Sequence, residues 1–303
     1  MITLAPTRPA RCSPPLALRV SRLPASRRAF SLIEILVSVA LLAVIMIGLV
    51  AMFGQTQKAF RAGLTQTDVL ESGRSLTDML GREIQEMRPS QADGVTNFFV
   101  DVNSPQAPLQ QTLPGNPVTP QSRINVLEDL FFLSLNNRQW QGIGYHVDAP
   151  DGLFGKLYRW TTNPAPNDVG SASQNFSQGR ASLNNFTRVA DGVVHFRIRA
   201  YDTNGVWLTT NALAWRALGP DRGTNIALVA RPQVSETAYV FRAGAIPAYV
   251  DIELGVLDPR TLERAKSIAD PLAQRNYLGQ QAGAVQIFRQ RIPLPNVDPT
   301  AYP

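Results

Sequence analysis

An uncharged apolar segment of 19 residues, Ile35–Phe53, restricts what this chain can fold into more than any other feature of its sequence. The segment reads ILVSVALLAVIMIGLVAMF, and Ser38 contributes its single hydroxyl group. A helix of this length, rising about 1.5 Å per residue, spans roughly 28 Å, close to the hydrocarbon thickness of a bilayer. The core helix of a soluble protein is the alternative, but such helices rarely run this far without a polar face. We therefore expect a membrane-spanning helix.

Basic residues gather on the N-terminal side of this segment. Residues 1–29 contain no acid and no lysine but six arginines: Arg8, Arg11, Arg19, Arg22, Arg27 and Arg28. The chain has 29 Lys and Arg residues and 23 Asp and Glu residues, so 23 of each sign remain beyond residue 29. Positive charge before a membrane span keeps that end in the cytoplasm. We therefore expect a single-pass protein of the bacterial inner membrane, with a cytoplasmic N-terminus and a periplasmic C-terminal domain.

The remainder of the chain is formally neutral, which gives no indication of nucleic-acid binding. The single cysteine, Cys12, lies in the basic segment as well. If that segment is removed, no thiol is left for a disulfide or for a Cys-ligated metal. The domain beyond the helix then has to be stabilised by its core, which about 210 residues can supply.

Glu34 directly precedes Ile35–Phe53 and is out of place in a simple membrane anchor. A carboxylate in hydrocarbon costs on the order of 2–3 kcal/mol, and such residues usually have a function. Glu34 needs a positive partner, which Arg27, Arg28 or a new α-ammonium group made by cleavage before Phe30 could provide. The alternative is an acid that extends to the membrane interface and has no further role.

The sequence RAFSLIEILV, from Arg28 to Val37, resembles the processing signal of type IV prepilins and type II secretion pseudopilins. In that family a prepilin peptidase of the inner membrane cuts between a small and an aromatic residue and N-methylates the new terminus. The resemblance implies cleavage between Ala29 and Phe30, followed by N-methylation of Phe30. It also implies that Glu34 assists methylation and pairs with the terminal amine of a neighbouring subunit, an attraction that is strong in low dielectric.

The resemblance also implies the partners of the chain. These are the prepilin peptidase, other pilins or pseudopilins that contact its N-terminal helix, and an inner-membrane assembly platform. No cofactor is expected. The sequence departs from the family at Ala29, where glycine is usual; alanine is the mildest replacement.

Residues 26–32, SRRAFSL, also resemble a twin-arginine export signal. Such signals have a weaker apolar region followed by a small-x-small cleavage site. Here the apolar region is long, no Ala-x-Ala follows it, and Glu34 would have no explanation. We therefore favour the prepilin interpretation.

Beyond the apolar segment the sequence predicts that the helix continues, with one apolar face, until Pro89 ends it. The apolar face is formed by Val69, Leu76, Leu80, Ile84 and Met87. The polar face carries Asp68, Glu71, Arg74, Asp78, Arg82, Glu83 and Glu86. The predicted organisation is a cleaved leader at 1–29, a transmembrane and filament-core helix at 30–54, its amphipathic continuation at 55–88, and a mainly β domain at 89–303.

The last of these segments alternates between loop and strand signals. Polar, proline-rich composition predicts loops at 89–125 and 163–184. Strands are predicted at 130–135, 139–147, 157–161, 194–199, 206–208, 249–254 and 284–292, and an interrupted helix at 260–280. The fold class is therefore α+β, a long N-terminal helix packed on an antiparallel sheet as in pilins.

The order of these pieces is similar to that in J-type minor pseudopilins of type II secretion and in PilW-like proteins. The residues that carry this similarity are GIGYHV at 142–147, LYR at 157–159, and the segments 194–207 and 246–254.

We find no motif that predicts catalysis or metal binding. His146 and His195 lie on predicted strands, and His195 is expected on a solvent-exposed polar face. GLFGK at 152–156 lacks the spacing of a phosphate-binding loop. The chain is therefore expected not to be an enzyme.

Two pairs of oxygen-bearing side chains have simple structural explanations. Asp251 and Glu253 share a strand face, which could suggest paired catalytic carboxylates but is more often a solvated face. Asp202 and Asn204 could suggest a calcium loop, yet a hairpin turn accounts for both.

Three functions remain. The first is a minor pseudopilin, a structural subunit of a type II secretion-like periplasmic pseudopilus, since major subunits of the family are usually smaller. The second is a minor pilin of a type IV pilus that serves adhesion, motility or DNA uptake. The third is a membrane-anchored periplasmic enzyme or binding protein, which would leave Glu34 unexplained.

Overall fold

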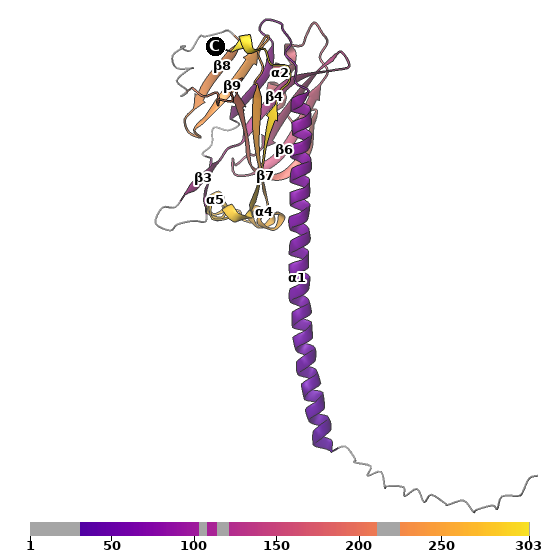
Figure 1. Ribbon diagram of the computed structural model, residues 1–303. Coiled ribbons are helices and arrows are strands. Elements are labelled where there is room, and N and C mark those ends of the chain that lie inside the picture. Colours follow the sequence, from indigo (N-terminus) through magenta and orange to yellow (C-terminus); the bar gives the residue numbers. More distant parts are fainter. Residues whose placement is uncertain (1–30, 103–107, 114–120, 211–224, 303) are drawn as a thin grey trace, which may run out of the picture. The chain divides into compact units, whose positions relative to one another are not determined.

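The computed structural model describes residues 31–102, 108–113, 121–210 and 225–302, and it forms two compact units, residues 1–58 and 59–303 (Figure 1). Helix α1, Leu32–Gln85, contributes to both. Ser31 caps its start, because its side-chain oxygen accepts the N–H of Glu34 at 3.2 Å. The helix ends at Gln85, three residues before the predicted end. There Met87 forms a β-bridge with Ser134, and the N–H of Arg88 donates to the carbonyl of Leu133.

The second unit is built on a curled sheet of nine strands, in the order β11-β10-β7-β6-β5-β4-β1-β9-β8, in which all neighbours are antiparallel. Its strands are β1 Thr96–Val102, β4 Glu128–Asn136, β5 Gln139–Asp148, β6 Gly155–Thr162, β7 Phe186–Tyr201, β8 Ile226–Arg231, β9 Glu236–Arg242, β10 Tyr249–Leu257 and β11 Val285–Pro293. A separate ribbon pairs β2 Leu109–Thr112 with β3 Ser122–Asn125. With α1, these strands confirm the α+β fold class.

Short helices cover parts of this unit. They are α2 Ser171–Gly179, α4 Pro259–Lys266, α5 Pro271–Gly279, and the 3-10 turns η1 Ala282–Ala284 and η2 Pro299–Ala301. Asp258 and Asp270 each cap a helix whose first residue is proline, which is why the predicted helical segment is interrupted where it is. Helices α4 and α5 lie side by side (Figure 1) and enclose a small apolar cluster with Leu109, Leu257 and Val285.

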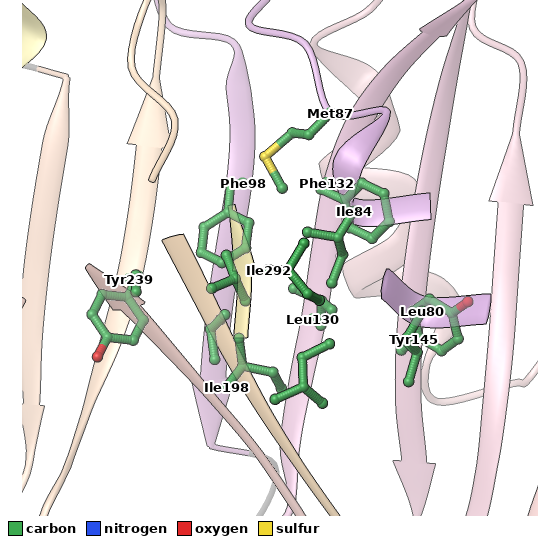
Figure 2. Close-up of a cluster of buried hydrophobic side chains, with 14 of the residues drawn as sticks. Leu80, Ile84, Met87, Phe98, Leu130, Phe132, Tyr145, Ile198, Tyr239 and Ile292 are labelled. Atoms are coloured by element: carbon green, nitrogen blue, oxygen red, sulfur yellow. The ribbon is translucent and has the colours of Figure 1, made fainter. Parts of the chain in front are cut away.

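The apolar face of α1 packs against this sheet, as its spacing predicts. Leu80 and Ile84 are fully buried and belong to one cluster with Leu130, Phe132 and Tyr145 (Figure 2). Burying a side chain of this size contributes roughly 1.5–3 kcal/mol relative to leaving it in water. The second half of α1 is therefore held mainly by apolar contacts.

The segment 89–125 is not the extended loop that its composition predicts. It contains β1, which lies between β4 and β9 and buries Phe98 and Val100, together with β2 and β3. The segment 163–184 likewise contains α2, whose Phe176 packs on the sheet. Strands β8 and β9 were not predicted at all. The segment 206–208 forms only an isolated bridge, between Trp207 and Tyr201.

Strand β7 changes its pairing part-way along its length. Its first half, to Val193, pairs with β6, and the half from Val193 onward pairs with β10. Beyond the end of β6, the N–H of Phe196 donates to the carbonyl of Val126 at 2.7 Å. The N–H of Ile198 donates to the carboxyl group of Glu128 at 2.5 Å. A backbone carbonyl and the side chain of Glu128 thus complete the hydrogen bonding of β7 here, which places a carboxyl group deep in the fold.

Candidate functional site

Of the residues that the sequence singles out, Glu34 lies on the first turn of α1, whereas Ala29 and Phe30 fall outside the described residues. Glu34 is exposed, and in the described part of the chain its carboxylate has no hydrogen-bonding or ionic partner. Its backbone is fully used, since its carbonyl accepts the hydroxyl of Ser38 at 2.7 Å. An acid near a helix N-terminus is favoured by the helix dipole, but that does not supply a counter-ion.

The surface around Glu34 is apolar on every side of the helix. From Leu32 to Phe53 each large apolar side chain of α1 is at least half exposed, Leu32 reaching 82%. By length and composition α1 can cross a membrane, with a mean hydropathy of 3.0 in its most apolar window. A soluble protein does not leave so large an apolar surface in water. The segment is consistent with a single-pass membrane anchor.

Glu83 occupies a different environment at the other end of α1, and its placement on a polar helix face was wrong. Its carboxylate accepts the hydroxyl of Tyr145 at 2.6 Å and the Nε–H of Arg159 at 2.9 Å. Tyr145 and Arg159 are direct partners in the register of β5 and β6. Burial, together with the negative charge of Glu83, raises the pKa of Tyr145. The two side chains hold α1 to the sheet through one carboxylate.

Both histidines are buried, which corrects the expectation that His195 lies at the surface. Burial lowers the pKa of His195, and its neutral ring accepts the N–H of Val126 at Nδ1 while Nε2 faces Glu253 at 3.4 Å. His146 bonds Asp129 through Nδ1 at 2.8 Å, and Arg180 pairs with the other oxygen of Asp129. Each ring is therefore engaged in maintaining the fold.

Asp251 and Glu253 do not form a solvated face either. Glu253 pairs with Arg197 at 2.6 Å and with Arg289 at 3.2 Å, the arginines that flank it in register on β7 and β11. Burial disfavours its ionisation, but hydrogen bonds from His195 and Arg197 and the charges of both arginines outweigh this and lower its pKa to about 2. Asp251 pairs with Arg291.

The turn after β7 is the hairpin turn that Asp202 and Asn204 predict. Asp202 Oδ1 accepts the N–H groups of Asn204 and Val206 at 2.9 and 2.7 Å, and Gly205 takes a positive φ of 75°. The carboxylate is used by the turn itself. Among the described residues, no three His, Cys, Asp or Glu side chains gather in a way that could hold a metal ion.

Comparison with known proteins identifies the N-terminal segment. Residues 24–50 match the family described as the prokaryotic N-terminal methylation motif. The match includes Ala29, Phe30 and Glu34, and it ends within the apolar segment. No curated protein and no solved structure shows significant similarity to this chain.

Proposed function

We propose, since the chain belongs to the type IV prepilin and pseudopilin family by its N-terminal motif, that it is a minor pseudopilin of a type II secretion-like periplasmic pseudopilus. The role is structural rather than catalytic. Its helix α1 first anchors the protein in the inner membrane and then packs among the helices of other pseudopilins. The proposed processing is cleavage between Ala29 and Phe30 by the prepilin peptidase, with N-methylation of Phe30.

The observation that carries this proposal is the position of Glu34. It is a carboxylate without a partner in the described part of the chain, at the head of an exposed apolar helix surface. Desolvating an unpaired carboxylate is strongly unfavourable, whereas the attraction of a paired cation offsets much of the desolvation cost. Cleavage before Phe30 would create an ammonium group four residues from Glu34 along the chain. A neighbouring subunit can present the same group.

The orientation follows from charge. Six arginines precede the apolar segment, and Lys58 and Arg61 are the first basic residues after it. This asymmetry supports a cytoplasmic N-terminus and a periplasmic β domain. The inner-membrane assembly platform would then contact the membrane-embedded first half of α1.

A pseudopilin is favoured over a surface pilin by the order of segments in the β domain, which is similar to that of J-type minor pseudopilins. The size of this domain favours a minor role in the same way. A membrane-anchored enzyme would give Glu34 no purpose. Cell fractionation separates the two filament types, because a pseudopilin stays in the periplasm whereas a pilin is recovered from sheared cell surfaces.

The test compares Glu34→Leu with Glu86→Leu, which removes an exposed carboxylate outside the apolar segment. Both variants should insert into the membrane like the wild type. Glu34→Leu should lose recovery in assembled filaments by tenfold or more, since an unpaired terminal ammonium costs several kcal/mol. Mass spectrometry should find N-methylated Phe30 at the mature terminus. Equal recovery of the two variants, or a retained Met1, would overturn the proposal.

A further inference from the structure

A groove of about 420 Å³ lies on the β domain, far along the chain from the N-terminal motif. One wall is the polar face of α2, and the floor is formed by β1, β9 and β8, at the end of the nine-stranded sheet. Helix α2 turns Ala172 and Phe176 toward the sheet, so its serines and glutamines at 173, 174, 177 and 178 line the groove. This volume is in the range of ligand-binding sites.

The floor of the groove is apolar and incompletely covered. Phe99 and Val240 are half-buried, and Val229 is 45% exposed. These residues come from three adjacent strands, so together they form one continuous strip. An apolar strip of this kind gains free energy when an aliphatic side chain covers it.

The rim of the groove carries three arginines and one acid. Arg231 is held by Asp101, the one acid, at 2.6 and 2.9 Å. Arg180 is held by the buried Asp129 and by the carbonyl of Ser177 at 3.3 Å. Arg242 is exposed and has no acidic partner in the described part of the chain. Two guanidinium groups are thus fixed in place, and a third is available to an incoming carboxylate.

We propose that this groove binds an extended acidic segment of a partner protein, in which carboxylates alternate with aliphatic residues. A carboxylate pairs with Arg242, and the adjoining aliphatic side chain covers Val229 and Val240. The amides and hydroxyls of α2 bind the backbone of the segment. This site does not depend on processing or assembly of the N-terminal helix.

Charge complementarity and shape select this occupant. Arginine forms paired hydrogen bonds with carboxylates. Since Arg231 is paired with Asp101 and Arg180 with Asp129, the described lining keeps one uncompensated positive charge, that of Arg242. A small inorganic anion could pair with an arginine but has no apolar group to contact the strip between the arginines. A flat lipid surface could contact the arginines of the rim but not the apolar floor below them, whereas an extended segment can contact both.

Binding can be measured with the full-length protein in neutral detergent micelles, by the fluorescence anisotropy of a labelled peptide. The probe is an acetylated Glu-Leu-Glu-Leu-Glu peptide, and its Gln-Leu-Gln-Leu-Gln analogue is the uncharged control. Arg242→Gln should weaken binding of the acidic peptide about tenfold, because it removes a charge-assisted hydrogen bond. Val229→Ser should weaken it severalfold by removing part of the apolar strip. Arg260→Gln, an exposed arginine on α4, is the matched control and should bind like the wild type.

Three results would overturn the proposal. The first is equal affinity for the acidic peptide and its glutamine analogue. The second is unchanged binding by Arg242→Gln. The third is binding to phosphatidylglycerol vesicles that Arg242→Gln abolishes while peptide binding is absent, which would assign the arginines to a membrane surface. Since the assay uses soluble micelles and no filament, its failure would leave the proposed function untouched.

Discussion

The two halves of α1 form one continuous helix, but they differ in the burial of their apolar side chains. Between Leu32 and Phe53 the large apolar side chains are all at least half exposed, whereas Leu80 and Ile84 are fully buried by the sheet. The carboxylates differ in the same way. Glu83 binds Tyr145 and Arg159, but Glu34 has no partner in the described part of the chain.

This difference shows that the β domain stabilises the second half of α1, whereas the large apolar side chains of the first half stay exposed in the part of the chain that the structure describes. An apolar residue in the second half contributes to folding, since its contacts form when the β domain forms. An apolar residue in the first half contributes to association with lipid or with other helices, which lie outside the chain. Substitutions of the same type should therefore have different consequences in the two halves.

The largest expected difference is between Leu80→Ala and Leu42→Ala. Leu80 is fully buried, so Leu80→Ala should lower the free energy of unfolding of the β domain by about 2–5 kcal/mol through lost burial and a cavity. Leu42 is 61% exposed, and Leu42→Ala should change it by less than about 0.5 kcal/mol. Urea unfolding of the full chain in micelles, followed by tryptophan fluorescence, measures both. A comparable loss in the two variants would show that the halves are not energetically distinct.

The sequence predicts best what depends on neighbouring residues. The methylation motif needs about ten consecutive side chains, and alternation alone identifies buried residues of two strands: Phe196 and Ile198 of β7, and Val250, Ile252 and Leu254 of β10. The starts of helices α4 and α5 are predicted by Asp258-Pro259 and Asp270-Pro271, in which the aspartate caps the helix and the proline is its first residue. Each of these signals is local, so no knowledge of the rest of the fold is required.

What the sequence did not predict depends on distant partners. Strand β1 is a short apolar stretch inside a polar, proline-rich segment, and its neighbours β4 and β9 are needed to make it a strand. A turn of about 100° per residue places Glu83 at the border between the apolar and polar faces of α1, about 40° from Met87 and about 60° from Glu86. Its partners Tyr145 and Arg159 are 62 and 76 residues away, so helical spacing alone cannot identify them.

A smaller difference is expected between Gly73→Ala and Gly48→Ala. A Cβ atom on Gly73 would lie 2.1 Å from the ring of Phe288 on β11, whereas one on Gly48 would meet nothing within 4 Å. Overpacking should cost Gly73→Ala about 1–3 kcal/mol, offset by up to about 1 kcal/mol of helix propensity. Gly48→Ala should leave unfolding of the β domain unchanged.

The close approach can be isolated with a double-mutant cycle. Phe288→Ala removes the ring, so adding Gly73→Ala to it should cost nothing further and should recover the helix propensity of alanine. The same urea titrations supply all four free energies of unfolding. Additive effects of Gly73→Ala and Phe288→Ala would contradict the contact between α1 and β11.

The last comparison concerns the carboxyl groups of Glu34 and Glu128, neither of which has a cation in contact within the described part of the chain. Glu128 is buried inside the β domain, where its carboxyl group accepts the N–H of Ile198. Burial raises the pKa of Glu128 well above its ordinary value of 4.5, and the hydrogen bond from Ile198 opposes this only in part. The folded state therefore keeps a proton that the unfolded state releases above about pH 4.5, and stability falls as the pH rises from there.

Glu128→Gln keeps the acceptor for Ile198 and removes the titration. The variant should match the wild type near pH 4, where both side chains are neutral, and should become the more stable of the two as the pH rises toward 8. Glu263→Gln, at an exposed position on α4, should show no such divergence. Urea unfolding at pH 4, 6 and 8 makes the comparison. Parallel pH profiles for Glu128→Gln and wild type would contradict this prediction, because they would mean that Glu128 has the same pKa in the folded and unfolded states.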